Sequence, residues 1–220
     1  MTEIEASRAR HAVRNYTAKP LSPEIIDELS EEIEQCNRQG QLHIQLVTEN
    51  EEAFKTFIPL FGRFKNVKNY IALAAKKQGD FYVKCGYCGA RLMVKAQQAG
   101  LNSCWVTNTY NAKKCPVTLA PDEELVGVIA IGYGTTDGTQ HKSKSMERLC
   151  KPCSDKWFLD GMNAAVLAPT GLNRQDFFIE ANGNTVSIRT KDNHPMSQIN
   201  TGIVKYHFEI GAGRENFNWE

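Results

Sequence analysis

The spacing of hydrophobic residues along the chain predicts several helices. Ser22 followed by Pro23 is typical of a helix start, because a hydroxyl can cap the first turn and proline suits its first position. Apolar residues then recur every three or four positions as far as Cys36, and Gly40 can end the helix. The same spacing predicts three further helices, near residues 87–99, 160–167 and 201–210.

Strands are predicted where apolar residues alternate with polar ones or form short runs. The nearly all-apolar run from Val126 to Ile131 predicts a central strand covered on both faces, and glycines 132, 134 and 138 after it predict a polar turn. Further strands are predicted at residues 42–46, 70–75, 177–179 and 186–188, and a polar linker at 142–155. Because helices and strands are mixed without strict alternation, we expect an α+β fold in one compact domain.

Composition excludes several classes of protein. The 220 residues include 26 Lys and Arg and 25 Asp and Glu, so the net charge of +1 argues against a nucleic-acid partner. No apolar run has the length of a membrane span, and the N-terminal residues do not resemble a secretory signal. Seven cysteines, an odd number, indicate a reducing compartment, so we expect a cytoplasmic protein with no membrane partner.

Two cysteine pairs have the spacing of metal ligands. Cys85 and Cys88 form one pair, and Cys150 and Cys153 form the other. Four thiolates could hold a structural zinc ion, but the two pairs lie much further apart than those of compact zinc ribbons. We therefore expect no metal site, and a zinc-stabilised interaction module remains the alternative.

Common catalytic and nucleotide-binding motifs are absent from the sequence. It contains no GxGxxG, no phosphate-binding P-loop, no HExxH and no GxSxG. The five histidines share no ligand spacing, and His207 has the position of a core residue with its hydrogen bonds satisfied.

Two short basic clusters are candidates for binding a phosphate group. The first contains Arg8, Arg10, His11 and Arg14, and the second contains His141, Lys142 and Lys144. Arg10 and Arg14 are predicted to lie one helical turn apart, so both can face the same anion. A solvated surface would explain the same residues.

The basic clusters belong to segments that resemble the FMN-dependent nitroreductase family. Residues 10–16, Arg-His-Ala-Val-Arg-Asn-Tyr, together with Lys19-Pro and the helix start at Ser22, are similar to the opening of that family. Four other segments are similar to the family's flavin-proximal segment, core strand, late phosphate-binding pair and Asn-bearing loop, namely residues 100–105, 127–134, 142–144 and 168–175.

The chain departs from the family pattern at four points. The Asn-bearing loop follows the core strand, as in a subgroup with rearranged halves, and Asp176-Phe177 replaces the usual Pro-Trp. Ala12 replaces the usual serine, which removes one hydroxyl contact to the phosphate but leaves the backbone N–H. Thr107-Asn108 replaces the acidic-Gly pair often found under the reactive edge of the flavin.

The resemblance implies a fold and a function. It implies one nitroreductase-like α+β domain over residues 1–220, with a central, mainly antiparallel sheet flanked by helices, pseudo-repeat halves at about 1–140 and 156–220, and a homodimer that binds FMN. It implies a ping-pong oxidoreductase that passes electrons from NAD(P)H to a nitro compound or quinone, with no catalytic side chain. A non-catalytic FMN-binding, storage or sensory protein is the alternative. The implied cofactor-binding residues are Arg10, His11, Ala12, Arg14, Thr107, Asn108, Lys142, Lys144 and Asn173.

Overall fold

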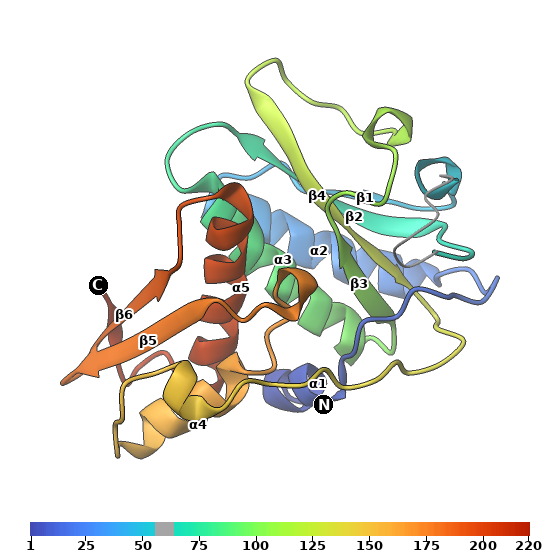
Figure 1. Cartoon of the computed structure of the whole chain (residues 1–220). Coiled ribbons are helices and arrows are strands. Elements are labelled where there is room, and N and C mark those ends of the chain that lie inside the picture. The colour runs from blue at the N-terminus through green and yellow to red at the C-terminus, as the bar shows by residue number, and fades with distance from the viewer. Residues whose placement is uncertain (56–63) are drawn as a thin grey trace.

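The computed structural model describes residues 1–55 and 64–220 of the chain (Figure 1). The α-helices of this part are α1 (Glu3–Ala9), α2 (Pro23–Gly40), α3 (Phe81–Gln98), α4 (Lys156–Ala165) and α5 (Pro195–Ala212). The strands are β1 (Gln45–Val47), β2 (Asn69–Lys76), β3 (Asn102–Val106), β4 (Glu123–Gly132), β5 (Phe177–Asn182), β6 (Thr185–Thr190) and β7 (Asn218–Trp219). Short 3-10 helices are η1 (Glu52–Phe54), η2 (Ala112–Lys114), η3 (Met146–Arg148) and η4 (Gly171–Asn173).

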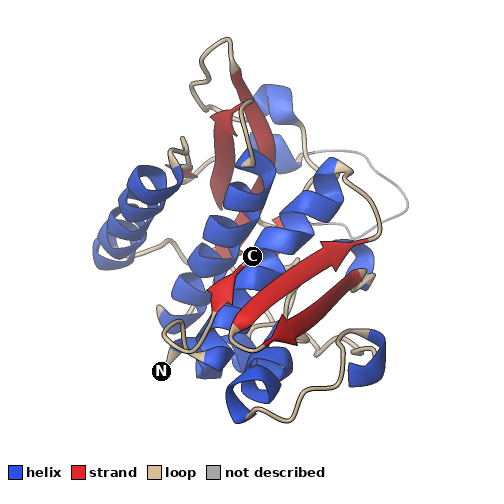
Figure 2. Cartoon of the chain, turned by 90° about the vertical axis from the view of Figure 1, so that its left-hand side faces the viewer, coloured by secondary structure: helices blue, strands red, loops and turns tan. Residues whose placement is uncertain are grey.

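The strands form two sheets. The first has the order β1-β2-β4-β3, and all its neighbouring strands are antiparallel. The second has the order β5-β6-β7, with one antiparallel and one parallel pair. Figures 1 and 2 show α3 and α5 packed side by side between the sheets, α3 against the first and α5 against the second. The predicted α+β fold with antiparallel strands and flanking helices is confirmed, although the strands are divided between two sheets.

The close approach of α3 and α5 depends on two glycines. A Cβ atom at Gly86 would collide with the carbonyl group of Ile199, and one at Gly202 would collide with the carbonyl group of Val83. Any larger residue at either position would therefore push the two central helices apart. Helix α5 carries His207, one of the buried polar residues described below.

Strand β4 is buried on both faces, as the sequence predicts. Ile129 and Ile131 belong to the hydrophobic cluster beneath the helices. Val128 and Ala130 belong to a second cluster on the opposite face, which also contains Val13. The N-terminal segment after α1 therefore packs directly on the first sheet.

Several predicted boundaries differ from the observed ones. Helix α2 begins as predicted, since the Ser22 hydroxyl accepts a hydrogen bond from the Ile25 N–H at 3.4 Å. Helices α3, α4 and α5 begin four to six residues before the predicted starts. In α5 the Nδ1 atom of His194 accepts a hydrogen bond from the Met196 N–H at 3.3 Å, which caps the helix start.

Four segments differ from what the sequence predicts. Helix α1, closed by a capping box between Thr2 and Glu5, is too short to show a helical period, and β3 was taken only as the exit from a helix. The strand predicted at 42–46 begins at Gln45. The predicted linker at 142–155 is packed, because the Leu149 carbonyl accepts a hydrogen bond from the Ile179 N–H at 2.8 Å. The assignment of residues 1–220 to one domain with pseudo-repeat halves stays a prediction.

Candidate functional site

The first predicted phosphate-binding segment is extended, not helical. Helix α1 ends at Ala9, and Arg10 has φ −73° and ψ 120°. The prediction that Arg10 and Arg14 lie one helical turn apart is therefore wrong. The segment instead runs beside β3, where Ala12 and Ser103 form a parallel bridge and the Val13 N–H donates to the Ser103 carbonyl oxygen at 3.2 Å.

Arg10 is the most unusual side chain of this segment. It is 3% exposed, and its Nε and Nη1 atoms have no hydrogen-bond partner among the residues that the structure describes. Burial lowers the pKa of its guanidinium to about 10. Leaving a buried cation unpaired costs several kcal/mol, so the site fits an anion that would accept hydrogen bonds from these two nitrogens.

Three histidines lie in the electrostatic neighbourhood of Arg10. His207 of α5 is 1% exposed, and burial, together with the charges of Arg10 and His141, lowers its pKa to about 3. Burial lowers the pKa of His11 as well, and the adjacent Arg10 charge adds to this effect. Arg10 thus lies where residues from the N-terminus, the loop after β4 and the C-terminal helix meet.

His207 is a core residue, as predicted, but only one of its ring nitrogens is satisfied within the described chain. Its Nδ1 atom lies 2.8 Å from the Ile203 carbonyl oxygen, which can only accept, so Nδ1 carries the proton. The Nε2 atom is buried without a partner among the described residues. The Ser7 and Ser103 hydroxyls are likewise buried without a hydrogen-bond partner among the described residues.

The loop after β4 brings the second basic cluster toward the first. Gly138, with φ +77°, lies so close to the N-terminal segment that a Cβ atom there would be 2.9 Å from the His11 Cβ and 3.1 Å from the Ala12 carbonyl oxygen. His141 continues the loop, and its Nε2 atom lies 2.9 Å from the Val166 carbonyl oxygen. The loop is therefore held against the N-terminal segment at Gly138 and against the end of α4 at His141.

Lys144 and Asn173, which the resemblance assigns to the flavin site, are engaged within the chain. The Lys144 Nζ atom lies 3.0 Å from a carboxylate oxygen of Asp176 and donates to the Gln175 carbonyl oxygen at 3.1 Å. The Asn173 amide donates to the Lys142 carbonyl oxygen at 2.8 Å. The structure thus brings Lys142, Lys144 and Asn173 into one hydrogen-bonded cluster.

The loop that carries Asn173 has a strained backbone. Leu172, Asn173 and Gln175 have φ values of 52°, 53° and 47°, in the left-handed region that residues other than glycine seldom adopt. Leu172 is 82% exposed. Backbone strain of this kind concentrates at functional sites, which agrees with a ligand-binding role for the loop.

The remaining candidates lie further from Arg10. Thr107 and Asn108 follow the end of β3, and the rise of a strand places Thr107 about 13 Å from Ser103. Arg14 is exposed, and its charge opposes the burial that raises the pKa of Cys104. Among the described residues, no backbone hydrogen bond or β-bridge joins Thr107 or Asn108 to the Asn173 loop.

Sequence reasoning missed four residues of this region. Ser103 lies inside a segment of family resemblance, but nothing in the sequence marks its side chain as unpartnered. Asp176 was identified only as a departure from the family, and Gln175 only as part of the loop. His207 had been assigned satisfied hydrogen bonds, and a single sequence gives no signal of the unpartnered Nε2 atom.

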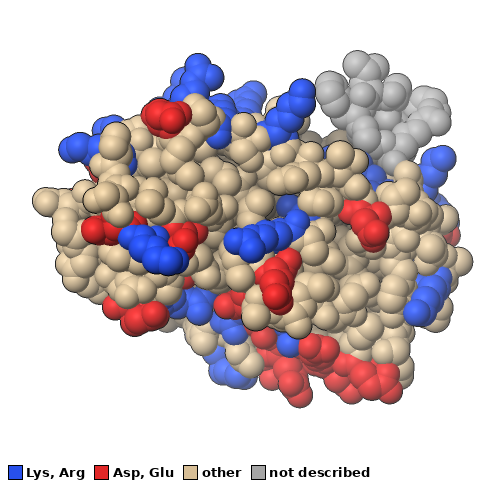
Figure 3. All heavy atoms as spheres, turned by 90° about the horizontal axis from the view of Figure 1, so that it is seen from below, with Lys and Arg blue, Asp and Glu red and all other residues tan. Residues whose placement is uncertain are grey.

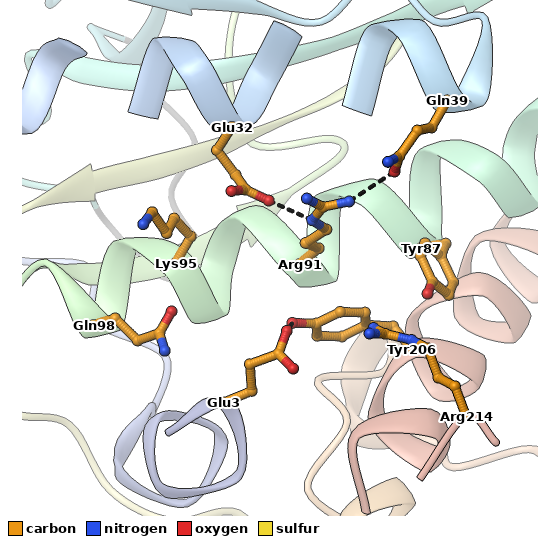
Figure 4. Close-up of a pocket in the computed structure, with 9 residues that line it drawn as sticks. All are labelled: Glu3, Glu32, Gln39, Tyr87, Arg91, Lys95, Gln98, Tyr206 and Arg214. Carbon is orange, nitrogen blue, oxygen red and sulfur yellow. Dashed lines mark hydrogen bonds and ion pairs between the residues drawn. The ribbon is translucent and has the colours of Figure 1, made fainter. Parts of the chain in front are cut away.

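A separate cavity of about 500 Å³ lies between α1, α2, α3 and α5 (Figure 4). At its centre Arg91 binds Glu32 through Nε and Gln39 through Nη1 at 2.8 Å. Across the cavity the Tyr206 hydroxyl donates to Glu3 at 2.7 Å. In the described part of the chain, its lining contains none of the buried polar atoms that lack a partner.

The two cysteine pairs have different neighbours. Cys88 contacts the Cys36 carbonyl oxygen through its Sγ atom at 3.9 Å, whereas Cys150 contacts the Met146 carbonyl oxygen at 3.5 Å. Within residues 1–55 and 64–220, no three His, Cys, Asp or Glu side chains are grouped so that they could hold a metal ion.

The face drawn in Figure 3 carries both basic and acidic side chains. Basic groups lie beside acidic ones over most of that face, and several acidic side chains gather at its lower edge, so neither sign covers it. Among the described residues, no helix combines the length and the hydrophobicity that a membrane crossing requires.

Comparison of folds relates the chain to nitroreductases. A nitroreductase structure from Thermotoga maritima aligns with a TM-score of 0.69 at 19% identity, covering 98% of this chain and 85% of that one. A nitroreductase in complex with FMN from Desulfovibrio desulfuricans aligns with a TM-score of 0.55 at 16% identity, covering 70% of this chain and 98% of that one. An NADH dehydrogenase/NAD(P)H nitroreductase from Parabacteroides distasonis aligns with a TM-score of 0.54 at 18% identity, covering 67% of this chain and 95% of that one. At these identities the likeness establishes the fold alone.

Sequence comparison establishes the family. No curated protein matches the chain. The model of a protein family described as "Putative TM nitroreductase" matches residues 3–212. Since this match covers nearly the whole chain, from α1 to the end of α5, the chain belongs to that nitroreductase family.

Proposed function

We propose that the protein is an FMN-dependent oxidoreductase that passes electrons from NAD(P)H to an electron-poor acceptor, such as a nitro compound or a quinone, in a ping-pong cycle. The observation that carries the proposal is the buried Arg10 guanidinium, whose Nε and Nη1 atoms have no partner in the described chain. The family of the chain and its likeness to a nitroreductase in complex with FMN support a flavin phosphate as the missing partner.

The residues around Arg10 fit a phosphate monoester. Arg10 would donate to the phosphate from inside the protein, and Arg14 and Lys142 would neutralise its charge from the exposed side. The backbone of His11 and Ala12 would assist. Lys144 fits the same role only if it exchanges its contact with Asp176 for the phosphate, and the exposure of this ion pair favours such an exchange.

The other predicted residues would orient the ring system. Asn173 lies on the strained loop and would hydrogen-bond the polar edge of the isoalloxazine. Thr107 and Asn108 lie at the far end of β3, about 13 Å from the partner of Ala12, where backbone donors would face the reactive edge. When bound, FMN would supply the redox chemistry itself, so that the protein needs no nucleophile or general base.

The proposal includes a homodimer in the cytoplasm. The exposed Leu172 beside Asn173, and candidate residues that do not all meet within one chain, fit a site completed by a second copy. All seven cysteines are free thiols, which fits a reducing compartment. Sedimentation of the FMN-loaded protein should give a dimer, and a monomer that retains FMN would contradict the shared site.

The decisive experiment is spectroscopic. The purified chain should be yellow and release about one FMN on denaturation. NAD(P)H should bleach the bound flavin rapidly, and a nitro compound or quinone should restore its colour. A chain that binds FMN but is not bleached would be a non-catalytic flavin-binding protein, and a chain that takes up no added FMN would contradict both functions.

A further inference from the structure

The chain lacks the serine hydroxyl that the family resemblance assigns to the phosphate site, because position 12 is alanine. The structure offers another hydroxyl beside that position. Ala12 forms a parallel bridge with Ser103 of β3, and the Val13 N–H fixes the register by donating to the Ser103 carbonyl oxygen at 3.2 Å. Paired residues on neighbouring strands project their side chains from the same face. The Ser103 side chain is therefore buried next to the Ala12 methyl group.

Arg10 shares this face with Ala12 and Ser103. Arg10 has extended φ and ψ and lies two residues before Ala12, which places the two side chains on the same side of the segment; Arg10 is buried there, whereas Ala12 is exposed. Two residues beyond Ser103, Trp105 packs toward α3, since a Cβ atom at Gly89 would collide with its ring. All these side chains thus point to the helical side of the sheet, where the electrostatic influence of Arg10 reaches His207.

Ser103 is also unsatisfied. The residue is 0% exposed, and its Oγ atom has no hydrogen-bond partner in the described residues. A buried hydroxyl without a partner is unfavourable, and serine changes rotamer at little cost. A hydroxyl and a guanidinium that are both buried, both unpartnered and on one face form a pair of donors for an anion.

We propose that Ser103 is a cofactor-binding residue whose hydroxyl donates to the phosphate group of FMN in place of the hydroxyl that Ala12 lacks. The inference rests on the proposed function, because it takes FMN as the ligand of the Arg10 site. It adds a residue from β3 to a phosphate site otherwise built from the N-terminal segment and the loop after β4.

The test compares FMN with riboflavin, which lacks the phosphate. Apoprotein is titrated with each flavin by fluorescence at one fixed salt concentration. Ser103→Ala should weaken FMN binding about 10-fold or more, as for a hydrogen bond to a charged group, and leave riboflavin binding within about twofold. Ser103→Cys, which keeps the size but donates weakly, should be intermediate.

A second substitution makes the test specific. In Ala12→Ser/Ser103→Ala the hydroxyl returns on the other side of the bridge, and most of the preference for FMN should return with it. Ser7→Ala is the matched control, because Ser7 is also buried with an unpartnered hydroxyl in the described chain but does not pair with Ala12. Its ratio of FMN to riboflavin affinity should stay within about twofold of that of the wild type.

Stability provides an independent readout. Because the hydroxyl is unsatisfied without ligand, the Ser103→Ala apoprotein should melt at the same temperature as the wild type or higher. Lower stability with equal weakening of both flavins would show a packing role and overturn the inference. So would an unchanged affinity ratio in Ser103→Ala, or an equal loss in Ser7→Ala. A wild type that binds FMN no better than riboflavin would overturn the proposed phosphate site, and this inference with it.

Discussion

Two arginines of this protein occupy opposite situations. All three guanidinium nitrogens of Arg91 have a partner, because Nε binds Glu32 and the two terminal nitrogens donate to Gln35 and Gln39 at 2.8 Å. Arg10 is more deeply buried, yet its Nε and Nη1 atoms have no partner in the described chain. The Arg91 network links α2 to α3 and needs no ligand. The Arg10 region carries a cost in the free protein that an anion would remove.

Acidification should affect the Arg10 region most strongly. The pKa of His207 is about 3 in the folded protein and about 6.5 when unfolded, so the unfolded chain binds the extra proton between these values. Stability should therefore fall as the pH falls from 6.5 to 3, by at most about 1.4 kcal/mol per pH unit and about 5 kcal/mol in total. Denaturant unfolding at several pH values measures this loss.

His207→Gln supplies the control for acidification, because glutamine does not titrate in this range. The stability of the variant should depend less on pH, and the difference between the two curves isolates the contribution of His207. Identical slopes in the wild type and the variant would mean that His207 is not held neutral by burial.

Substituting each arginine should separate binding from folding. Arg10→Ala should weaken FMN binding about 10- to 150-fold, because each hydrogen bond to a charged group contributes roughly 1.5–3 kcal/mol. It should spare riboflavin binding and leave the apoprotein at least as stable. Arg91→Ala should leave both flavin affinities unchanged and lower the free energy of unfolding by about 1–3 kcal/mol, since it leaves partly buried acceptors unpaired.

Fluorescence titration and denaturant unfolding provide the two readouts, and Arg8→Ala is the matched control. Arg8 is exposed and lies two residues before Arg10, outside the segment of family resemblance. Its removal should change neither quantity. If Arg91→Ala weakened FMN as much as Arg10→Ala does, the contrast between the two regions would be lost.

Removing the internal partner of Lys144 should have the smallest effect. Asp176→Asn would release the Lys144 ammonium group, whose Nζ atom lies 3.0 Å from the carboxylate. Because exposed ion pairs contribute about 0.2–1 kcal/mol, FMN binding should tighten by about two- to fivefold, and less at high salt. Asp160→Asn, which opens the exposed pair with Lys156, should have no effect on the titration.

The sequence predicts the fold better than it predicts the site. The periodicity of α2 and the apolar run of β4 are strong signals, because packing on one or two faces requires them. Helix α1 has too few residues to show a helical hydrophobic period. Its end nevertheless determines the position of Arg10, which follows directly after it. The sequence of their segment identifies Arg10 and Arg14 as candidate phosphate-binding residues. It does not indicate that Arg10 is buried and Arg14 exposed. Whether the Ser103 hydroxyl and the His207 Nε2 atom find hydrogen-bond partners depends on residues about 90 or more positions away in the sequence. No local pattern encodes such distant neighbours.

The parallel bridge between Ala12 and Ser103 also has a consequence for biosynthesis. Arg10 and Ala12 are made before the bridge partner of Ala12, Ser103, and His207 is made about 100 residues after Ser103. The proposed phosphate site therefore depends on contacts of long sequence separation, which form late in folding. A nascent chain that stops before α5 should fail to retain FMN even where the first sheet is complete. Cofactor retention would then report that α5 has been made and has packed against α3.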